Sequence, residues 1–478
     1  MSFIILPSSN TGATISAVAT GSIALGSPVV INTDSTVQQV GLTSDPTILG
    51  YGTEVTCAPA TTSFYSSRAF YDASTGKIVL VYKDGSNSNY GTAVIVTVSG
   101  TSITFGTPVV YQSASTNYNN VAGDSNGKVL VTYTAPVNTA YGIVGTISGT
   151  SISFGTRATV PTAAGYNGTV GIAYDTNSAI YAIFYQSADG ANFGNVNLGT
   201  VSGTSVTFDA GVFLAIPVNN LSCAYDANVK KIAFFYRDIN TGDGKSTVGT
   251  IAGGAITFGT AATFSTGGSA TLMSTIYDAT NLKIITAYNN VSTGKVIVGT
   301  ISGTSISFGT ASTFTSTNTQ YLSLGYNQST TKTIISFTDG TSIAGKATIG
   351  TVSGTSISIG TATTFAASIS ESYFQTFSGG TGTVIFYVVS TVPKAIVSTT
   401  GSSSNLTSSN YVGLSSAAVT TGQTATIQVI SNTNTNQTAL SIGKYYYVQL
   451  NGTLALTPDT TSVYAGISLS ATSLLIKG

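Results

Sequence analysis

Short runs of apolar and β-branched residues, bounded by glycine, asparagine or aspartate, recur along almost the whole chain. Runs of this length between turn residues are typical of β-strands, and none approaches the roughly 18 apolar residues of a membrane-spanning helix. The best-formed unit contains four such runs, so we expect strands at 66–72, 78–83, 92–98 and 102–111. The pattern predicts an all-β fold.

A hairpin signature recurs six times within this pattern. Its first copy runs from Val98 to Ile103 (Val-Ser-Gly-Thr-Ser-Ile), and the glycines of the six copies stand at positions 100, 149, 203, 253, 303 and 354. A type II′ turn requires glycine at its first central position, because that residue has a positive φ. The signature therefore predicts a hairpin in which Val98 lies opposite Ile103.

A second pattern counts seven units. In each unit a turn joins two apolar strands, and the second strand ends in an aromatic residue: Tyr82, Tyr133, Tyr185, Tyr236, Tyr288, Phe337 and Tyr387. Strand-only units of about 50 residues match the blades of a β-propeller. We predict a seven-bladed β-propeller of four-stranded units, and the altered seventh unit, about 371–415, leaves counts of six or eight open.

Two further segments flank the repeats and also contain strand and turn patterns. The expected domains are an N-terminal β module at 1–58, the propeller at 59–415 and a C-terminal β module at 416–478. The flanking regions share a phrase, Val-Gly-Leu-Thr-Ser at 40–44 and Val-Gly-Leu-Ser-Ser at 412–416. Because propeller closure often takes strands from both ends of a chain, we expect the termini to meet.

Composition narrows the classes of function. Charged residues make up 7% of the chain and the formal net charge is +0, so no overall field attracts nucleic acid or an anionic membrane. The chain has no histidine, which removes Ser-His-Asp triads and imidazole metal ligands. The amino terminus lacks a signal-peptide pattern. We expect no cofactor, no metal, no nucleic-acid partner and no membrane insertion, and we interpret Cys57 and Cys223 as buried free thiols, with a bridge as the alternative.

An aspartate opens the first turn in most units: Asp72, Asp124, Asp175, Asp226 and Asp278, with Asn327 in the sixth. Carboxylates bind calcium and act in acid–base pairs, but the Asp-x-Asp-x-Asp-Gly spacing of a calcium loop is absent. An aspartate at this place accepts hydrogen bonds from the backbone N–H groups of its own turn. We therefore interpret the series as structural and assign no catalytic residue.

The turns at the two ends of each unit differ in character. One end carries near-identical short turns, whereas the other carries loops that differ in every unit, such as 83–90, 186–193 and 237–245. Variable loops on a rigid scaffold are common binding sites. The candidate binding residues in these loops are Tyr90, Tyr118, Tyr141, Tyr166, Phe193, Asp189, Asp238 and Asp243. The seven strand-ending aromatics are expected to pack between blades rather than to form a sugar-stacking ring.

Two stretches of the chain carry a family resemblance. One is the repeat itself, most clearly over Lys77 to Thr107, and the other is the closing segment with Tyr-Tyr-Tyr-Val at 445–448 and the end from Ala471. Both resemble virion proteins of marine tailed phages. The resemblance implies a structural component of a phage particle, such as a tail fibre or surface appendage, assembled in the host cytoplasm and present in multiple copies on the virion surface or tail. Its implied partners are other virion proteins and a host cell-surface glycan or protein.

The leading hypothesis is a non-enzymatic virion protein that binds the host surface through its variable loops. One alternative is a capsid or tail decoration protein that contacts other virion subunits alone. The other is a polysaccharide-degrading propeller, for which Asp189, Asp238 and Asp243 are the loop carboxylates.

Overall fold

The computed structural model describes residues 13–57, 64–136, 139–161, 166–188, 191–267, 270–369, 375–379 and 382–477. Every named element in these ranges is a β-strand, so the prediction of an all-β fold is confirmed. No helix of the described part is long and apolar enough to cross a membrane. The chain forms two compact units, residues 47–400 and residues 1–46 with 401–478.

The larger unit contains seven repeats of one strand pattern. Repeat 1 consists of β6 (Phe64–Asp72), β7 (Lys77–Asp84), β8 (Tyr90–Ser99), β9 (Ser102–Phe105) and β10 (Val109–Ser115). Repeat 2 consists of β11 (Asn117–Gly123), β12 (Lys128–Ala135), β13 (Thr139–Ser148), β14 (Ser151–Phe154) and β15 (Ala158–Thr159). Repeat 3 consists of β16 (Tyr166–Asp175), β17 (Ile180–Ser187), β18 (Phe193–Ser202), β19 (Ser205–Phe208) and the start of β20 (Val212–Asp226).

The remaining repeats continue this order. Repeat 4 takes the rest of β20 with β21 (Lys231–Asp238), β22 (Gly244–Ala252), β23 (Ala255–Phe258) and β24 (Ala262–Ser265). Repeat 5 consists of β25 (Ala270–Asp278), β26 (Lys283–Asn290), β27 (Thr293–Ser302), β28 (Ser305–Phe308) and β29 (Ser312–Thr315). Repeat 6 consists of β30 (Leu322–Asn327), β31 (Lys332–Thr338), β32 (Gly345–Ser353), β33 (Ser356–Ile359) and β34 (Thr363–Ala366).

Repeat 7 combines strands from two distant parts of the chain. It consists of β35 (Gln375–Gly379), β36 (Gly382–Val389) and β37 (Val392–Ser404), with β4 (Leu42–Tyr51) and β5 (Val55–Thr56) paired to β37. The N-terminal strands thus occupy the place of the hairpin that the seventh unit has lost. The expectation that strands from both ends of the chain combine is confirmed.

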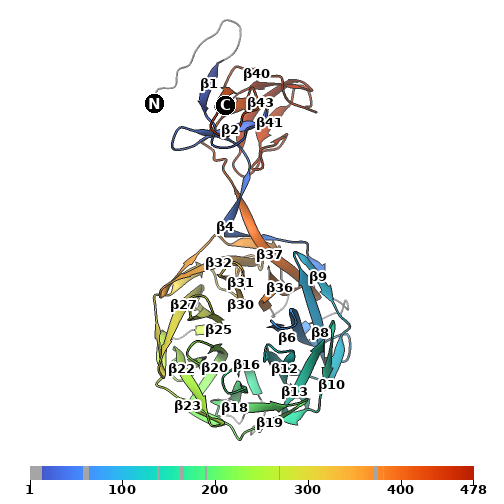
Figure 1. Ribbon diagram of the computed structural model, residues 1–478, viewed down its shortest axis with the longest axis vertical. Coiled ribbons are helices and arrows are strands. Elements are labelled where there is room, and N and C mark those ends of the chain that lie inside the picture. Colours follow the sequence, from blue (N-terminus) through green and yellow to red (C-terminus); the bar gives the residue numbers. More distant parts are fainter. Residues whose placement is uncertain are drawn as a thin grey trace. The chain divides into compact units, whose positions relative to one another are not determined.

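In repeats 1 to 6 the first three strands pair in chain order, and the pairing is antiparallel, as in repeat 1. Figure 1 shows the sheets of the larger unit around a ring, with β6, β16, β25 and β30 toward its middle and β10, β19 and β23 at its periphery. Repeats 3 and 4 share one sheet of nine strands, because β20 continues from the outer edge of one into the inner strand of the other.

The predicted continuous strand at 102–111 is wrong, because the structure breaks it after Phe105. β9 pairs with one end of β8 and β10 with the other, and residues 106–108 between them are in neither strand. Pro108 has no N–H to donate to a ladder, and Gly106 lies against the next repeat. A Cβ at Gly106 would lie 1.9 Å from the carbonyl oxygen of Thr150.

The side chains that open the first turn of repeats 1 to 6 accept backbone hydrogen bonds, as the sequence predicts. Asp278 Oδ1 accepts hydrogen bonds from the N–H groups of Thr280 (3.0 Å) and Asn281 (2.9 Å), and Asn327 receives two such bonds in repeat 6. The structural interpretation of the aspartate series is confirmed. The predicted pairing of Val98 with Ile103 is confirmed too.

The glycine at the start of each signature hairpin has a positive φ, between 58° at Gly100 and 61° at Gly354. In five copies the following residue has no such φ, as a type II′ turn requires. The fourth copy differs, because Gly253 and Gly254 have φ values of 59° and 79°. Two positive φ angles are the pattern of a type I′ turn, so the type II′ prediction is wrong at this hairpin.

The strand-ending aromatics form the core between consecutive repeats. Tyr133 packs on Tyr111 of repeat 1, with ring centroids 5.2 Å apart, and Phe337 packs on Phe314 of repeat 5 at 5.0 Å. All seven are buried, with exposed fractions of 0% to 2%. The prediction that they pack between repeats is confirmed.

A glycine–threonine contact also recurs between neighbours. A Cβ at Gly259 would lie 1.8 Å from the carbonyl oxygen of Thr304, in the signature hairpin of the following repeat. Gly155, Gly309 and Gly360 lie against the next threonine in the same way. Glycine is needed there because the next repeat's backbone occupies the space of a side chain.

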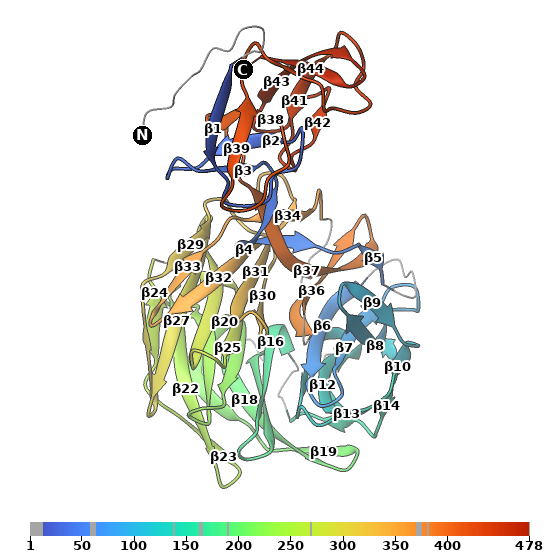
Figure 2. The same ribbon diagram turned by 45° about the horizontal axis from the view of Figure 1, so that its top comes forward.

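The smaller unit contains two five-stranded sheets (Figure 2). The first is formed by β1 (Thr14–Val18), β2 (Pro28–Ile31), β3 (Val37–Gln39), β38 (Tyr411–Ser415) and β39 (Thr424–Gln428), in the order β1-β39-β38-β2-β3. The second is formed by β40 (Thr433–Asn434), β41 (Tyr445–Val448), β42 (Leu454–Ala455), β43 (Val463–Ser470) and β44 (Ser473–Ile476). The flanking segments, expected as two modules, therefore share one sheet.

Candidate functional site

One row of side chains crosses each repeat from its second strand to its outer edge. In repeat 4, Tyr236 lies opposite Lys245, which lies opposite Thr263. Residues directly opposite in an antiparallel pair share a face of the sheet. Tyr236 is 1% exposed, the Lys245 side chain is 23% exposed, and Thr263 is exposed. The row therefore begins in the core between repeats and ends at the surface.

All seven repeats contain this row, and we call each one a junction row. Its middle position holds, in order, Thr92, Tyr141, Asn195, Lys245, Lys295, Lys346 and Lys394. Its outer position holds Val110, Thr159, Phe213, Thr263, Thr313, Thr364 and Thr56, and all seven of these are exposed. The row faces the preceding repeat, because its aromatic packs there in repeats 2 and 5 to 7.

Three of the four lysines in these rows are paired with a carboxylate. Lys245 Nζ lies 2.8 Å from Asp238 Oδ2, and Lys394 Nζ lies 3.0 Å from Glu54 Oε1. Lys346 forms an ion pair with Asp339. Each pair presents a donor and an acceptor side by side, which is what recognition of a sugar hydroxyl uses.

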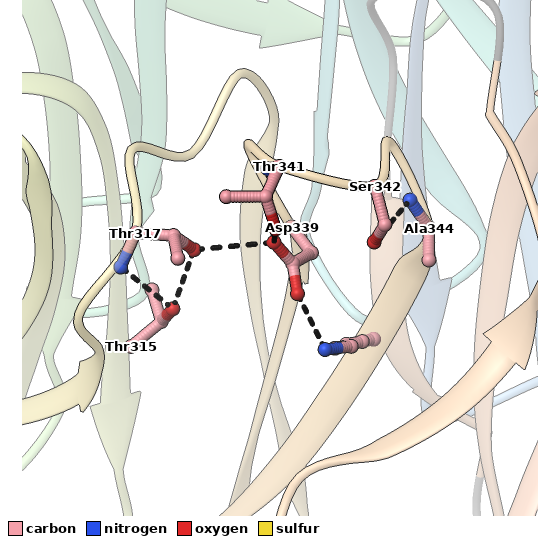
Figure 3. A network of polar contacts seen from close by, with 7 residues as sticks. Thr315, Thr317, Asp339, Thr341, Ser342 and Ala344 are labelled. Atoms are coloured by element: carbon pink, nitrogen blue, oxygen red, sulfur yellow. Dashed lines mark hydrogen bonds and ion pairs between the residues drawn. The ribbon is translucent and has the colours of Figure 1, made fainter.

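Figure 3 shows the Asp339 network at the junction of repeats 5 and 6. The carboxylate of Asp339 accepts hydrogen bonds from the Thr341 N–H (3.0 Å) and from the hydroxyl of Thr317, which belongs to the connection from repeat 5. The Lys346 ammonium and the Thr341 hydroxyl and N–H hold the pKa of Asp339 well below its usual range. Asp339 is therefore ionised at neutral pH and acts as an acceptor.

Asp238, a candidate from the sequence, has the same arrangement in repeat 4. Its N–H donates to the carbonyl of Asp243 (2.9 Å), and its Oδ1 accepts from Asn240 N–H (2.9 Å). Partial burial favours the neutral form, but the hydrogen bonds from Lys245 and from the loop backbone outweigh it and lower the pKa of Asp238. A general acid needs a raised pKa, so Asp238 is poorly suited to donate a proton in glycoside cleavage.

The junction row of repeat 2 has a different chemistry. The guanidinium of Arg157 lies 4.3 Å from the ring centroid of Tyr141, and Arg157 Nη1 donates to Gln112 Oε1 at 2.6 Å. Tyr133 donates to the same oxygen at 3.1 Å. Gln112 comes from repeat 1, so the row is held to its neighbour by hydrogen bonds. The result is a half-exposed aromatic ring beside a cation.

The remaining residues predicted to bind lie in several environments. Tyr90 and Phe193 begin β8 and β18 and are half-buried, and Tyr118 is 37% exposed at a φ of 51°. Tyr166 is 2% exposed and packs on Tyr185 at 4.8 Å. Asp189 lies outside the described residues.

Of the predicted set, the structure places Tyr141 in a junction row and Asp238 beside one, in an ion pair with the row residue Lys245. The sequence identified the buried aromatic of each row, but it did not point to the row lysines such as Lys346 or to their neighbours Arg157 and Asp339. A signal for them existed, because three of the row lysines follow a glycine that begins or nearly begins the third strand, as in Gly345-Lys346.

A second polar feature lies on the inner strands. A cavity of about 220 Å³ is lined by Arg68, Asn120, Ser222, Ser274 and Ser323 among others. Each of these five stands four residues before the turn-opening aspartate or asparagine of its repeat, so one position of successive inner strands supplies the lining. Among the described residues no group of three or more Cys, Asp or Glu side chains is placed to hold a metal ion.

Both cysteines are free thiols in the structure. Cys57 is buried, whereas Cys223 on β20 is half-buried by residue exposure. The two side chains lie in different buried clusters, so the interpretation as unbridged thiols is confirmed. The expected full burial is confirmed for Cys57 and holds only in part for Cys223.

The chain matches no known family model, and no curated protein matches it in sequence. Its fold, however, is similar to solved structures, among them two lectins. The BP39L lectin from Burkholderia pseudomallei has a TM-score of 0.50 at 10% sequence identity, over 71% of this chain and 99% of that one. The SapL1 lectin, solved with α-methyl fucoside, has a TM-score of 0.42 at 12% identity, over 65% and 97%. AofleA from Arthrobotrys oligospora has a TM-score of 0.43 at 12% identity, over 74% and 100%. The likeness to BP39L agrees with the all-β, propeller-like fold of the larger unit.

Proposed function

We propose that the larger unit is a closed seven-bladed β-propeller. Contacts between its last and first repeats support this proposal. Cys57 from the segment after β5 packs in one buried cluster with Tyr82 of repeat 1 and Val388 of repeat 7. Gly52 lies against Thr101 of the first hairpin, as the glycines of other repeats lie against their following threonine. No repeat then has an unpartnered side.

We further propose that this propeller is a non-enzymatic carbohydrate-binding protein whose sugar sites are the junction rows. The observation that carries the proposal is the repetition of one side chain with a polar group beside a buried aromatic, which is half-exposed at five of the seven junctions: Tyr141, Lys245, Lys295, Lys346 and Lys394. The equivalent Thr92 and Asn195 are buried, with exposed fractions of 2% and 3%. Adjacent donor and acceptor groups recognise sugar hydroxyls, and exposed aliphatic or aromatic surface accepts the apolar face of a pyranose ring. The likeness to a lectin fold is consistent with this use of the scaffold.

A glycan array with the full chain tests the proposal. Sugar binding should occur, and titration should give more than one site per chain. The double variant Tyr141→Ala/Lys346→Met should bind fewer sugars per chain, because it removes the middle side chain of two rows. Lys332→Met is the matched control, since Lys332 donates to Thr351 (2.9 Å) at the opposite end of the same repeat. Equal loss in this control, or no sugar binding by the wild-type chain, would contradict the proposal.

A place on the particle of a tailed phage is the biological setting that we propose for this activity. Its support is the repeat and closing-segment resemblance, and a host cell-surface glycan would be the ligand. Labelled antibody against the chain should decorate the tail or surface of an imaged particle. Shortening of a host polysaccharide by the pure chain would instead favour the enzymatic alternative.

A further inference from the structure

Repeat 5 differs from the other lysine-containing repeats in one charge. Lys295 occupies the same row position as Lys245, Lys346 and Lys394. Its Nζ donates to the Thr313 hydroxyl at 2.7 Å, and among the described residues no carboxylate forms an ion pair with it. Among the residues that the structure describes, the junction of repeat 5 therefore has a positive charge without a paired carboxylate, whereas a carboxylate neutralises the lysine at the three equivalent junctions.

The sequence explains this difference at a single position. Asp238 and Asp339 each stand two residues after the buried aromatic of their repeat, and the equivalent residue in repeat 5 is Asn290. The Asn290 carbonyl accepts a hydrogen bond from the Thr293 hydroxyl (3.1 Å), so the loop keeps an ordered turn without the acid. The amide of asparagine has nearly the shape of the carboxylate but no charge to offer the lysine.

The turn between β26 and β27, which carry Tyr288 and Lys295, is also distinctive. Val291, the residue after Asn290, is 68% exposed and has a φ of 56°. A β-branched residue at positive φ is strained, and such strain is often found at ligand-binding positions. The floor of the junction is the edge-on pair of Phe264 and Tyr288, with centroids 5.1 Å apart. An aromatic pair and an ammonium group thus meet at one row, and the hairpin that carries Tyr288 and Lys295 has an exposed aliphatic residue at its turn.

We infer that the junction of repeats 4 and 5 binds sugars that carry a carboxylate, such as uronic or sialic acids, through the Lys295 ammonium and the Thr313 hydroxyl. A carboxylate accepts from both donors, and a hydrogen bond to a charged group is stronger than a neutral one. At the paired junctions the internal acid repels the same ligand. The inference rests on the proposed carbohydrate-binding function and names the ligand class of one of its sites.

A matched pair of ligands isolates the charge: an oligosaccharide with a terminal uronate, and the same molecule with its carboxyl group reduced to an alcohol. Wild-type chain should bind the uronate form more tightly. Lys295→Met should weaken uronate binding by roughly 10- to 100-fold, the range expected for loss of a charge-assisted hydrogen bond, and should weaken binding of the reduced ligand by a smaller factor, because only a neutral acceptor is then lost to the lysine. Asn290→Asp should do the same by supplying the acid found in repeats 4 and 6.

The reciprocal change is Asp339→Asn, which should give repeat 6 a second uronate-preferring site and raise the number of uronate ligands bound per chain. Lys332→Met again serves as the control, and thermal melting establishes that each variant is folded. Unchanged uronate affinity in both Lys295→Met and Asn290→Asp, with neutral sugars still bound, would overturn the inference alone. Failure of the wild-type chain to bind any sugar would overturn the proposed function and the inference with it.

Discussion

At the junction of repeats 3 and 4, two residues differ from those at the equivalent positions of the other repeats. Asp209 replaces the glycine that elsewhere receives the next hairpin, and Gly254 replaces the threonine of that hairpin. The Asp209 carboxylate accepts from the N–H groups of Leu198 (2.7 Å) and Gly211 (3.2 Å). Gly254 has a φ of 79°, and a Cβ there would meet nothing within 4 Å. The aspartate side chain in repeat 3 thus occurs together with a different turn type in the hairpin of repeat 4.

This covariation predicts coupled stabilities. Gly254→Thr should destabilise the protein by about 1–2 kcal/mol, because threonine disfavours a positive φ and a type II′ turn would bring its carbonyl toward Asp209. Asp209→Gly in the same chain should recover part of the loss. Urea unfolding of the two single variants and the double variant measures the coupling, and additive changes in the free energy of unfolding would contradict it.

At the Asp339–Lys346 pair, acidity should reduce stability. The folded-state pKa of Asp339 is lowered from 3.8, so the ionised form stabilises the fold above about pH 4, and this contribution is lost as the pH falls further. The Lys346 side chain is 31% exposed, so solvent screening keeps the effect small. The melting temperature of wild type should fall between pH 5 and 3 by more than that of Asp339→Asn; parallel pH profiles would count against the pair.

At the scale of the element, the hairpin between the first and second strands has one acceptor side chain in each of repeats 1 to 6. Asp278 is 1% exposed and accepts from two backbone N–H groups and from the Asn281 amide (2.8 Å). In repeat 6 the asparagine at 327 accepts the equivalent backbone bonds. The turn therefore requires an oxygen at this position and tolerates either side chain.

A pair of substitutions tests this requirement. Asp278→Ala leaves buried N–H groups without an acceptor and should cost about 1–3 kcal/mol of unfolding free energy. Asp278→Asn keeps the acceptor and should cost less than about 1 kcal/mol. Denaturant titration of both variants provides the measurement, and equal losses would show that the charge, not the acceptor, matters.

For the whole molecule, the proposed closure between repeats 7 and 1 predicts that distant segments of the larger unit unfold together. Cys57, which is 1% exposed, belongs to the cluster at this closure, whereas Cys223 lies on β20 between repeats 3 and 4. Burial raises the pKa of the Cys57 thiol well above its usual value and raises that of Cys223 to about 12. Neither thiol should react while the propeller remains folded.

Thiol labelling in increasing urea reports on the closure. Using Cys223→Ser and Cys57→Ser to leave one thiol at a time, both should become reactive at the same denaturant concentration, because a closed ring opens in one cooperative step. Labelling of Cys57 at clearly lower urea would mean that the closure opens first and would contradict cooperative unfolding. Circular dichroism on the same samples gives the global transition for comparison.

The amino-acid sequence by itself determined the strands, the repeat count of seven strand-ending aromatics and the turn chemistry of residues such as Asp278. These features are local: the residues that form a turn or a hairpin are adjacent in the chain, so the sequence displays them directly. Only the tertiary structure decided that β4 and β5 complete repeat 7, that Tyr166 is buried on Tyr185, and that Lys346 meets Asp339 while Lys295 has Thr313. Those contacts depend on strand register and on packing between repeats, which residues adjacent in sequence do not specify.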